Sequence, residues 1–350
     1  PSTGGSPRCG AIGVLREKCH VTQDPESHRE EQRAMTSPFC KNYCMDVHHL
    51  RTLRELRDRG SVTAVAEVLR LSPSAVSQQL AVLQRSFDAP LTEQRGRVLV
   101  LTAAGERLAD AGGDVIESMA RAEQSVSQFL EAPAETVTVT AFHSAALAWF
   151  PELVARSLAD PEGAQVRCRD EDVSIQDFLN LTADHDVVIA HRSPSSPKWP
   201  ERRVRVIPVI EEPIDLALRR SHPLAAYDTI ALTDLDGATW LAAHEGFALE
   251  PLIVQALAAG AGTPLEITHR VNEFNVAAAI IARTDTIGFL PRYTGLLTAL
   301  KDEIVLRPIR DLSITRDIDI LVRPERLARA SVRAVVERIL DVARQQSGAR

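Results

Sequence analysis

Small and hydrogen-bonding side chains share one side of the segment from Pro73 to Phe87. At helical spacing they are Ser74, Ser77, Gln78, Ala81 and Arg85. Glutamine pairs with adenine through two hydrogen bonds, serine contacts a base or a phosphate, and an α-helix fits the major groove of DNA. A plain solvated face usually carries Glu and Lys pairs, whereas this face has no acid. The pattern therefore favours contact with duplex DNA over an ordinary polar surface.

A second group of DNA-directed side chains follows in the sequence. Arg95 and Arg97 flank Gly96 between two short β-prone runs, residues 91–93 and 98–101. We expect a β-hairpin wing with both arginines at its tip, where a guanidinium reaches phosphates or a minor groove. Residues 45–102 contain eight arginines against six acids, whereas the whole chain has a formal net charge of −7. This difference predicts one basic module among acidic ones.

Three predicted helices position these residues. The first, from Met45, has its apolar residues on one side and ends at Gly60, which suits a left-handed cap. Ser61 is placed to cap a second helix over residues 62–70. Ser72 and Pro73 start the third helix as an N-cap and a proline at the first helical position. The core stripe of the third helix would be Val76, Leu80, Leu83 and Phe87.

One long helical pattern follows from Thr102 to Leu130 without proline, and Gly112 and Gly113 weaken its middle. Its apolar residues recur at spacings of 3 and 4, as in a coiled-coil seam of about four heptads. They are Ala104, Leu108, Ala111, Val115, Met119, Ala122, Val126 and Phe129. Two interpretations remain open at this point, a dimerising helix and a helix packed on its own domain.

Beyond Pro133 the sequence alternates between strand and helix patterns, which indicates an α/β fold with parallel sheets. Expected strands include residues 136–142, 165–172, 186–190, 214–220, 239–244, 265–270, 286–290 and 317–322. Helices are expected near residues 145–158, 175–181, 251–260, 276–283 and 326–345. The pattern occurs twice, with a break near Glu211, Glu212 and Pro213. We therefore predict two α/β subdomains joined by crossover strands.

Residues 45–105 resemble the DNA-binding end of LysR-type transcriptional regulators. The shared pattern is MD-x-x-x-LR-x-L, GS-x-T-x-x-A, SPSAVSQQL-x-x-L and a GR before LT-x-AG. The resemblance implies a winged helix-turn-helix domain over 45–102, with the helix-turn-helix itself at 62–81. It also implies a linker or dimerisation helix at 103–131 and an α/β periplasmic-binding-protein-like (type 2) effector domain at 134–350. Subdomain I would comprise about 134–212 and 321–350, and subdomain II about 213–320.

The resemblance places Ser72, Ser74, Ser77 and Gln78 near base edges or phosphates. The full set of predicted DNA-contacting residues is Ser61, Thr63, Ser72, Ser74, Ser77, Gln78, Arg85, Arg95 and Arg97. The wing departs from the family, which usually has LF-x-R where this chain has residues 91–94. Thr92 loses an aromatic ring and Gln94 loses a positive charge, so Arg95 is the candidate replacement for that phosphate contact.

Ligands of open α/β sheets bind at the carboxyl ends of strands, against helix N-termini. Three such places resemble the family's cleft between subdomains, and their residues are His143, Ser144, His244, Glu245, Phe247, Asn272 and Glu273. Ser144 is either a helix N-cap alone or a cap that also binds ligand. His143 either binds an acid or is a partly buried core histidine. Glu245 would repel a carboxylate, which favours an amine or a polar neutral effector unless its side chain points away.

The cysteines and the first residues bear on cofactors and location. Four of the five cysteines lie in residues 1–44, and their spacing matches no zinc site, so we expect no metal and no cofactor. We predict that residues 1–44 form a disordered extension, with Met45 as the natural start. The apolar run AIGVL is too short for a signal peptide, and no run approaches the roughly 20 residues of a membrane span. These features point to a cytoplasmic protein without a membrane partner.

The sequence thus predicts a sequence-specific transcription regulator whose activity is modulated by a small-molecule effector. A homodimer or homotetramer would read a partly palindromic site on double-stranded DNA. An enzyme is not expected, because the nucleophile-elbow, Walker, zincin and dinucleotide motifs are all missing from the sequence. His185, His191, Asp184 and Asp186 are interpreted as solvated strand ends. The alternatives are a cytosolic small-molecule binding protein with vestigial DNA binding and an enzyme on the same α/β domain.

Overall fold

The structure is a computed structural model that describes residues 45–127, 135–244, 266–294, 300–310 and 312–347. All described residues belong to one compact unit, residues 45–350. The predicted extension at 1–44, the predicted helix at 251–260, and the candidate residues Glu245 and Phe247 lie outside the described residues.

The predicted three-helix start is present as α2 (Val47–Arg59), α3 (Val62–Leu69) and α4 (Pro73–Gln84). Gly60 ends α2 with a φ of 65°, in the left-handed region where glycine meets no Cβ penalty. Leucines from α2 and valines from α3 and α4 pack into one apolar cluster. Its most deeply buried members are Leu50, Leu53, Leu56, Val65, Val76, Leu83 and, from α5 (Ala103–Ser127), Ala109.

A two-stranded wing and a long helix complete this region. Strands β1 (Thr92–Arg95) and β2 (Val98–Leu101) pair antiparallel around Gly96, and α5 (Ala103–Ser127) starts directly after β2. Helix α5 is continuous through Gly112 and Gly113. Gly112 lies against Leu50 of α2, so the missing side chain allows the two helices to approach closely.

The remaining strands form one mixed sheet. Nine described strands belong to it, ordered β4-β3-β5-β11-β6-β9-β7-β8, with β10 paired to β6. The strands are β3 (Thr136–Ala141), β4 (Gln165–Asp170), β5 (Val187–Arg192), β6 (Arg205–Arg219), β7 (Thr239–Ala242), β8 (Glu266–Arg270), β9 (Ile287–Pro291), β10 (Ile304–Arg307) and β11 (Thr315–Val322). The α-helices are α6 (His143–Ala159), α7 (Phe178–Leu181), α9 (Phe274–Ile281), α10 (Pro324–Leu327) and α11 (Ala330–Ser347). Short 3-10 turns occupy Pro223–Ala226 and Leu232–Leu235.

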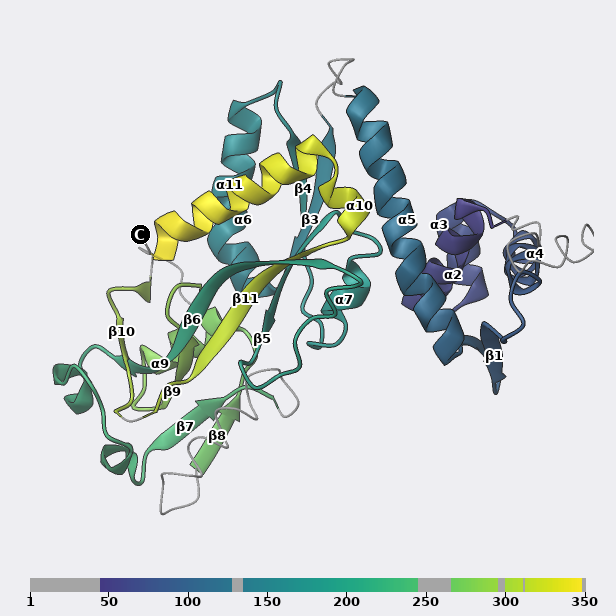
Figure 1. The fold of residues 1–350 in the computed structure, drawn as a ribbon. Coiled ribbons are helices and arrows are strands. Elements are labelled where there is room, and N and C mark those ends of the chain that lie inside the picture. Colours follow the sequence, from purple (N-terminus) through teal and green to yellow (C-terminus); the bar gives the residue numbers. More distant parts are fainter. Residues whose placement is uncertain (1–44, 128–134, 245–265, 295–299, 311, 348–350) are drawn as a thin grey trace, which may run out of the picture. The chain divides into compact units, whose positions relative to one another are not determined.

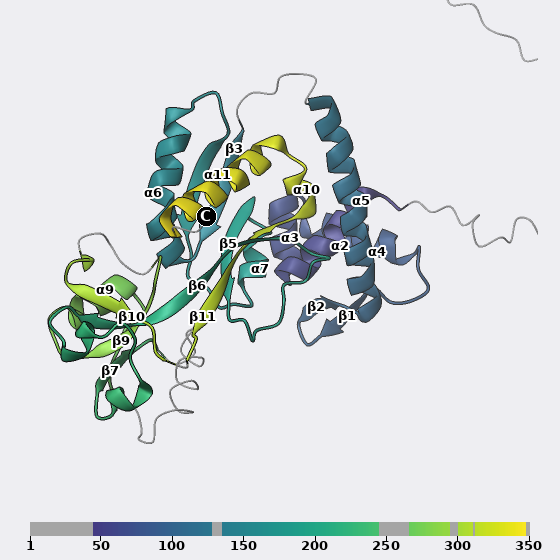
Figure 2. The same cartoon turned by 60° about the vertical axis from the view of Figure 1, so that its left-hand side comes forward.

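Two long strands, β6 and β11, lie side by side and connect the two halves of the sheet (Figures 1 and 2). Strand β6 pairs with β11 up to Pro213, and with β9 and β10 beyond it. The predicted break at residues 211–213 is therefore the middle of one continuous strand. The expectation of parallel sheets holds within each half but is wrong for β6, β10 and β11, which run antiparallel to their neighbours.

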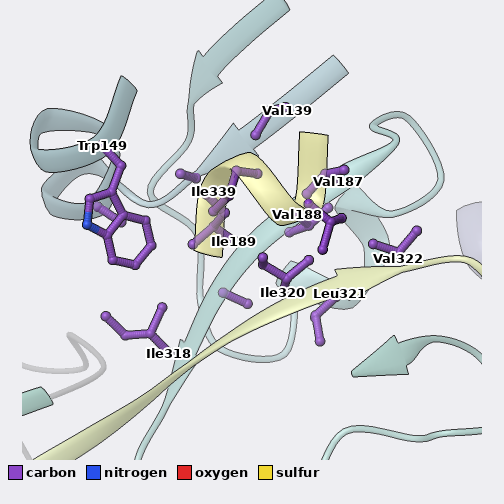
Figure 3. Packing of buried hydrophobic residues seen from close by; sticks show 14 of the residues in the cluster. Val139, Trp149, Val187, Val188, Ile189, Ile318, Ile320, Leu321, Val322 and Ile339 are labelled. Atoms are coloured by element: carbon purple, nitrogen blue, oxygen red, sulfur yellow. The ribbon is translucent and has the colours of Figure 1, made fainter. Parts of the chain in front are cut away.

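Each half of the sheet has its own apolar core. In the first half, Trp149 of α6 and Ile339 of α11 pack with Ile189 of β5 and Ile320 of β11 (Figure 3). In the second half, Trp240 stacks on Phe289 with ring centroids 5.7 Å apart. Two α/β halves with separate cores and two crossover strands confirm the predicted fold class. None of the described helices is long and apolar enough to cross a membrane.

Candidate DNA interface and effector cleft

Helix α4 has the start that the sequence predicts. The Ser72 hydroxyl accepts a hydrogen bond from the Ala75 backbone N–H at 3.1 Å and lies 2.8 Å from the Ser74 hydroxyl. Pro73 occupies the first turn. The cap leaves Ser72 and Ser74 exposed at the N-terminal end of the helix, where an N-terminal dipole favours a phosphate.

The exposed side of α4 presents the predicted polar residues. Ser74, Ser77, Gln78 and Arg85 are all exposed, whereas Val76, Leu80 and Leu83 are buried. The Ser77 hydroxyl donates to the Pro73 carbonyl at 3.0 Å, so its remaining capacity is as an acceptor. Gln78 has no hydrogen-bond partner within the described part of the chain. Its amide is therefore free both to donate and to accept, as bidentate pairing with adenine requires.

Gln84 fixes the end of α4 to the wing, a role that sequence reasoning missed. Its amide nitrogen donates to the carbonyls of Phe87 and Ala89, and its amide oxygen accepts from the Leu91 N–H at 2.7 Å. Three hydrogen bonds from one side chain thus hold the loop that leads into β1. The run of turn residues after Arg85 was the available signal for a loop that needs such support.

The other predicted DNA-contacting residues differ in whether their side chains already bond within the chain. Ser61 caps α3 through the Ala64 N–H at 3.5 Å, and Thr63 is exposed beside it. Arg95 is not a free tip residue, because it pairs with Glu93 at 2.7 Å on the same strand. Arg97 occupies the turn, is exposed, and has no ion-pair partner in the described chain. Of the two wing arginines, Arg97 is therefore the better placed for a phosphate.

A buried polar cluster lies where the crossover strands meet the two halves. Arg316 of β11 pairs with Glu212 of β6 at 2.7 Å, and both side chains are almost inaccessible. Arg316 also donates to the Ser144 hydroxyl at 3.0 Å and the Thr294 hydroxyl at 2.7 Å. Glu212 accepts from the Thr294 N–H at 2.7 Å. Four segments of the chain are thereby joined at the base of the predicted cleft.

Ser144 does not have the predicted role of a helix cap. Helix α6 starts at His143 with Phe142 as its N-cap and without a side-chain cap hydrogen bond. Ser144 is the second residue of the helix and is only 5% exposed. Its hydroxyl is occupied by Arg316, and by Thr294 at 3.3 Å. The cap prediction failed because the helix starts earlier, with Phe142, two positions before Ser144, as the N-cap.

His143 lies between carboxylates of both halves. Its Nδ1 is 3.1 Å from Asp170 of β4, and its Nε2 is 3.7 Å from Glu273 at the start of α9. Its backbone N–H donates to Asp172 at 2.8 Å. The side chain is 41% exposed and is paired with Asp170, so both predicted roles, a ligand contact and a partly buried paired histidine, stay open. The N-terminal end of α6 already has a carboxylate partner, which makes it a poor place for a second anion.

Asn272 and Glu273 bond to the backbone at His244 and at the start of α9. The Asn272 side-chain oxygen accepts from the His244 N–H at 2.8 Å, which brings two predicted residues together. Glu273 caps α9 by accepting from the Val276 N–H at 2.7 Å. Burial alone would raise the pKa of Glu273, but hydrogen bonds from Asn275 and Val276 and the nearby His143 together lower it. Glu273 is thus ionised at neutral pH.

The prediction of solvated strand ends around β5 is wrong for His185, Asp186 and His191, which are buried, whereas Asp184 is exposed. His191 is buried between Phe142 and Phe178, with ring centroids at 4.6 and 5.4 Å. Burial, with a smaller contribution from Arg316, lowers the pKa of His191 well below its usual value. Asp186 accepts from the Thr138 N–H and hydroxyl. Within the described residues, no three His, Cys, Asp or Glu side chains are grouped as metal ligands.

Comparison with known proteins places these features in one family. Residues 47–106 match the profile described as bacterial regulatory helix-turn-helix protein, lysR family. Residues 131–344 match the profile described as LysR substrate binding domain. The chain belongs to the LysR family of bacterial transcriptional regulators.

Individual relatives are distant. GbpR, an HTH-type transcriptional regulator of Rhizobium radiobacter, is 25% identical over 195 residues, 55% of this chain and 64% of GbpR. This alignment therefore spans slightly less than two thirds of GbpR. A probable RuBisCO transcriptional regulator of Synechocystis is 22% identical over 305 residues, 83% of this chain and 84% of that protein. A full-length OxyR variant from Pseudomonas aeruginosa has a similar fold, with a TM-score of 0.60 at 18% identity, covering 87% and 97% of the two chains.

Proposed function

We propose that this protein is a sequence-specific DNA-binding transcription regulator whose activity responds to a small-molecule effector. The main support comes from Gln78, whose side chain is exposed and unpaired in the described chain. It lies on a capped helix within a region that matches the LysR helix-turn-helix profile. Such a regulator acts where bacterial DNA lies, so we place it in the cytoplasm. We assign no catalytic role, because the relatives are regulators.

The nine predicted DNA-contacting residues divide by expected role. We assign base contacts to Ser74, Ser77 and Gln78 on the exposed face of α4. We assign phosphate contacts to the remaining residues, which are Ser61, Thr63, Ser72, Arg85, Arg95 and Arg97. The exposure of α4 and of the wing turn supports this division, with Arg95 as the weakest member because Glu93 already neutralises it.

We place the effector in the cleft lined by His143, Ser144, His244, Asn272 and Glu273, with Glu245 and Phe247 in the adjoining segment. Three carboxylates, those of Asp170, Asp172 and Glu273, surround His143. They favour an amine or a polar neutral effector over an anionic one, because like charges repel in a partly desolvated site. Binding there would shift the relation between the two halves and thereby the geometry on DNA.

We further propose the predicted domain limits and a dimer. The DNA-binding domain would be 45–102, the linker helix 103–131, and the effector domain 134–350. Subdomain I would be about 134–212 and 321–350, and subdomain II about 213–320. Val115, Met119 and Val126 of α5 are exposed in the single chain, as a seam for a second copy requires. Two copies would match the half-sites of a partly palindromic operator, and dimers of dimers are compatible with it.

A gel-shift titration with DNA from upstream of the protein's own gene tests this function. Retardation of that fragment at concentrations that leave unrelated DNA free is the expected result. Failure to retard any DNA at low salt would contradict the regulator and favour a small-molecule binding protein with vestigial DNA binding.

A thermal-shift screen of metabolites on the full chain tests the effector site, because a bound ligand raises the melting temperature by mass action. Amines and polar neutral compounds should stabilise the protein and simple carboxylates should not. A carboxylate that stabilises wild type but not His143→Ala would contradict the assigned effector class.

A further inference from the structure

Helix α2 contains charged side chains that are buried although its apolar face is already used by leucines. Arg54 and Glu55 are only 6% and 5% exposed, and the Asp58 side chain is 6% exposed. The apolar cluster of the helix-turn-helix contains none of them. Burying charges costs free energy unless partners are present, so these residues must have a second contact surface.

The partners of α2 come from the start of α10, about 270 residues later in the chain: Arg323 is the N-cap of α10 and Glu325 lies in its first turn. Arg323 donates to Glu55 at 2.6 Å and to Asp58 at 2.5 Å. Arg54 donates to Glu325 at 2.5 Å. We call this group the ionic seam, defined as Arg54, Glu55 and Asp58 of α2 with Arg323 and Glu325.

Further ion pairs surround the ionic seam. Arg203 pairs with Asp58 at 2.7 Å. Arg59 pairs with Glu55 at 2.8 Å and with Asp184 at 2.7 Å. Arg57 pairs with Asp110 of α5 at 2.8 Å. Together the five arginines face five carboxylates, so the group is electrically neutral. The described apolar cores on its two sides share no residue. Ion pairs therefore contribute much of the contact between α2 and residues 323–325.

The charges of the ionic seam stabilise one another. Burial alone would raise the pKa of Asp58, but Arg323, Arg57 and Arg203 hold it below its usual value. Burial would also raise the pKa of Glu325, and Arg54 reverses that effect. Removal of one partner leaves a buried charge uncompensated, which is costly. Such a contact therefore favours two arrangements, one in which all ion pairs are formed and one in which the two surfaces have separated and their charges are solvated. This gives the seam two discrete states, as a switch requires.

The seam has a direct mechanical link to the DNA-reading helix. Thr52 lies on α2 between Leu50 and Arg54, and its hydroxyl donates to the Gln79 side chain of α4 at 2.5 Å. Gln79 is the neighbour of Gln78 in the sequence. Arg323 and Glu325 follow β11, the strand that contributes Arg316 to the base of the cleft. The contacts thus run from Arg316 at the cleft, along β11 to the seam, and from the seam through Thr52 to Gln79 on α4.

We propose that α2 is the docking surface for residues 323–325 of the effector domain of the same chain, and that this ionic seam transmits the state of the cleft to the orientation of α4. The inference rests on the proposed function and adds the contact that would couple effector binding to DNA binding. Opening of the seam frees α4 to turn relative to the effector domain. Closing it fixes the angle between the two α4 helices of a dimer.

Charge reversal and charge swap in the full-length protein test the seam. We expect Arg54→Glu and Glu325→Arg each to accelerate amide hydrogen exchange in α2 and in residues 323–327. The double variant Arg54→Glu/Glu325→Arg should recover most of the wild-type protection. Arg344→Glu, which reverses an exposed arginine paired with Asp341 on α11, is the matched control and should leave both segments unchanged. If a reversal variant does not fold, Glu325→Gln removes the charge at nearly constant size and should change exchange in the same direction.

Operator binding by the same variants tests the transmission. Each single variant should change the affinity for DNA from upstream of the gene by about fivefold or more, the usual range of coupling between sites. The double variant should return toward wild type. Unchanged exchange in the single variants, no recovery in the double variant, or altered exchange with unaltered operator affinity would each overturn the inference. Failure of wild type to bind any DNA would instead overturn the proposed function, and the exchange comparison would still decide whether the seam exists.

Discussion

At the residue scale, the DNA-facing side of α4 combines occupied and unoccupied hydrogen-bonding groups. Ser72 is used as a cap and Ser77 is bonded to the backbone, whereas Gln78 is unpaired within the described chain. This division sets the expected contribution of each residue. A group that must first break an internal bond gains less from a base contact than one that is already free.

Gln78→Ala is expected to weaken binding to the specific site by about 1–3 kcal/mol, because one bidentate base pairing is lost. Binding to unrelated DNA should be unchanged. Arg97→Ala should instead lower affinity for all sequences and reduce the salt dependence by about one released ion. Anisotropy titrations over a range of salt concentrations measure both effects. Equal losses of specific and non-specific binding in both variants would contradict the assignment of base and phosphate contacts.

His191 gives a pH prediction, because its ring is buried and its pKa is well below the usual value. Below about pH 6.5 the unfolded chain binds a proton at His191 and the folded chain does not. Stability therefore falls as the pH drops through the usual range of a histidine pKa.

Urea unfolding at both pH values measures the effect. His191→Asn should remove this part of the pH dependence, and the control His269→Asn, at an exposed position, should keep it. A pH dependence that is the same in all three proteins would mean that His191 is protonated in the folded state.

At the element scale, the wing is held by the start of α5. A Cβ placed on Gly105 would lie 2.0 Å from the Leu91 carbonyl oxygen, so the glycine permits the backbone before β1 to pass against the helix. Together with the three hydrogen bonds of Gln84, this contact fixes the loop between α4 and the wing. The family-like LT-x-AG pattern thus has a physical reason in this chain.

Gly105→Ala is expected to destabilise the DNA-binding domain by about 1–3 kcal/mol through this overlap. Gly113→Ala on the same helix is the matched control, because an added Cβ there meets nothing within 4 Å. The control should stabilise the protein by about 0.5–1 kcal/mol, since alanine favours the helix. Thermal unfolding of both variants provides the comparison, and equal behaviour would show that Leu91 does not constrain residue 105.

Elements with strong local signals could be predicted from the sequence, whereas contacts between distant segments could not. The cap at Ser72, the stop at Gly60 and the alternation within β3 are local, and each lies where the sequence predicts. The pairing of Arg316 with Glu212 joins positions 104 residues apart, so no local pattern marks it. The bond from Arg316 to Ser144 spans a still longer stretch of the sequence, so it too could not be predicted. The free Gln78 was predictable because helical periodicity alone assigns it to the polar face.

At the scale of the whole molecule, α5 has two different faces. Ala109, Gly112 and Ile116 are buried within the chain, whereas Val115, Met119 and Val126 are exposed. The exposed residues belong to the predicted coiled-coil seam. A second copy of the chain would remove this apolar surface from water.

Met119→Lys is expected to weaken dimerisation, because a charge would enter the seam, while leaving the single chain folded. Gln124→Lys, on a different side of α5, is the control and should keep the wild-type mass. Light scattering coupled to size-exclusion chromatography measures the oligomer. A dimer that persists unchanged in Met119→Lys would place the interface elsewhere.

The central claim is that α4 reads a DNA sequence, and the ratio of specific to non-specific affinity tests it most directly. This ratio is measured by competition at physiological salt, with the fragment upstream of the gene against a scrambled fragment of equal length. We predict a ratio of about 10³ or more in wild type and a ratio lowered about fivefold or more by Gln78→Ala. A ratio near one in wild type, with binding governed only by salt, would contradict sequence-specific regulation by this protein.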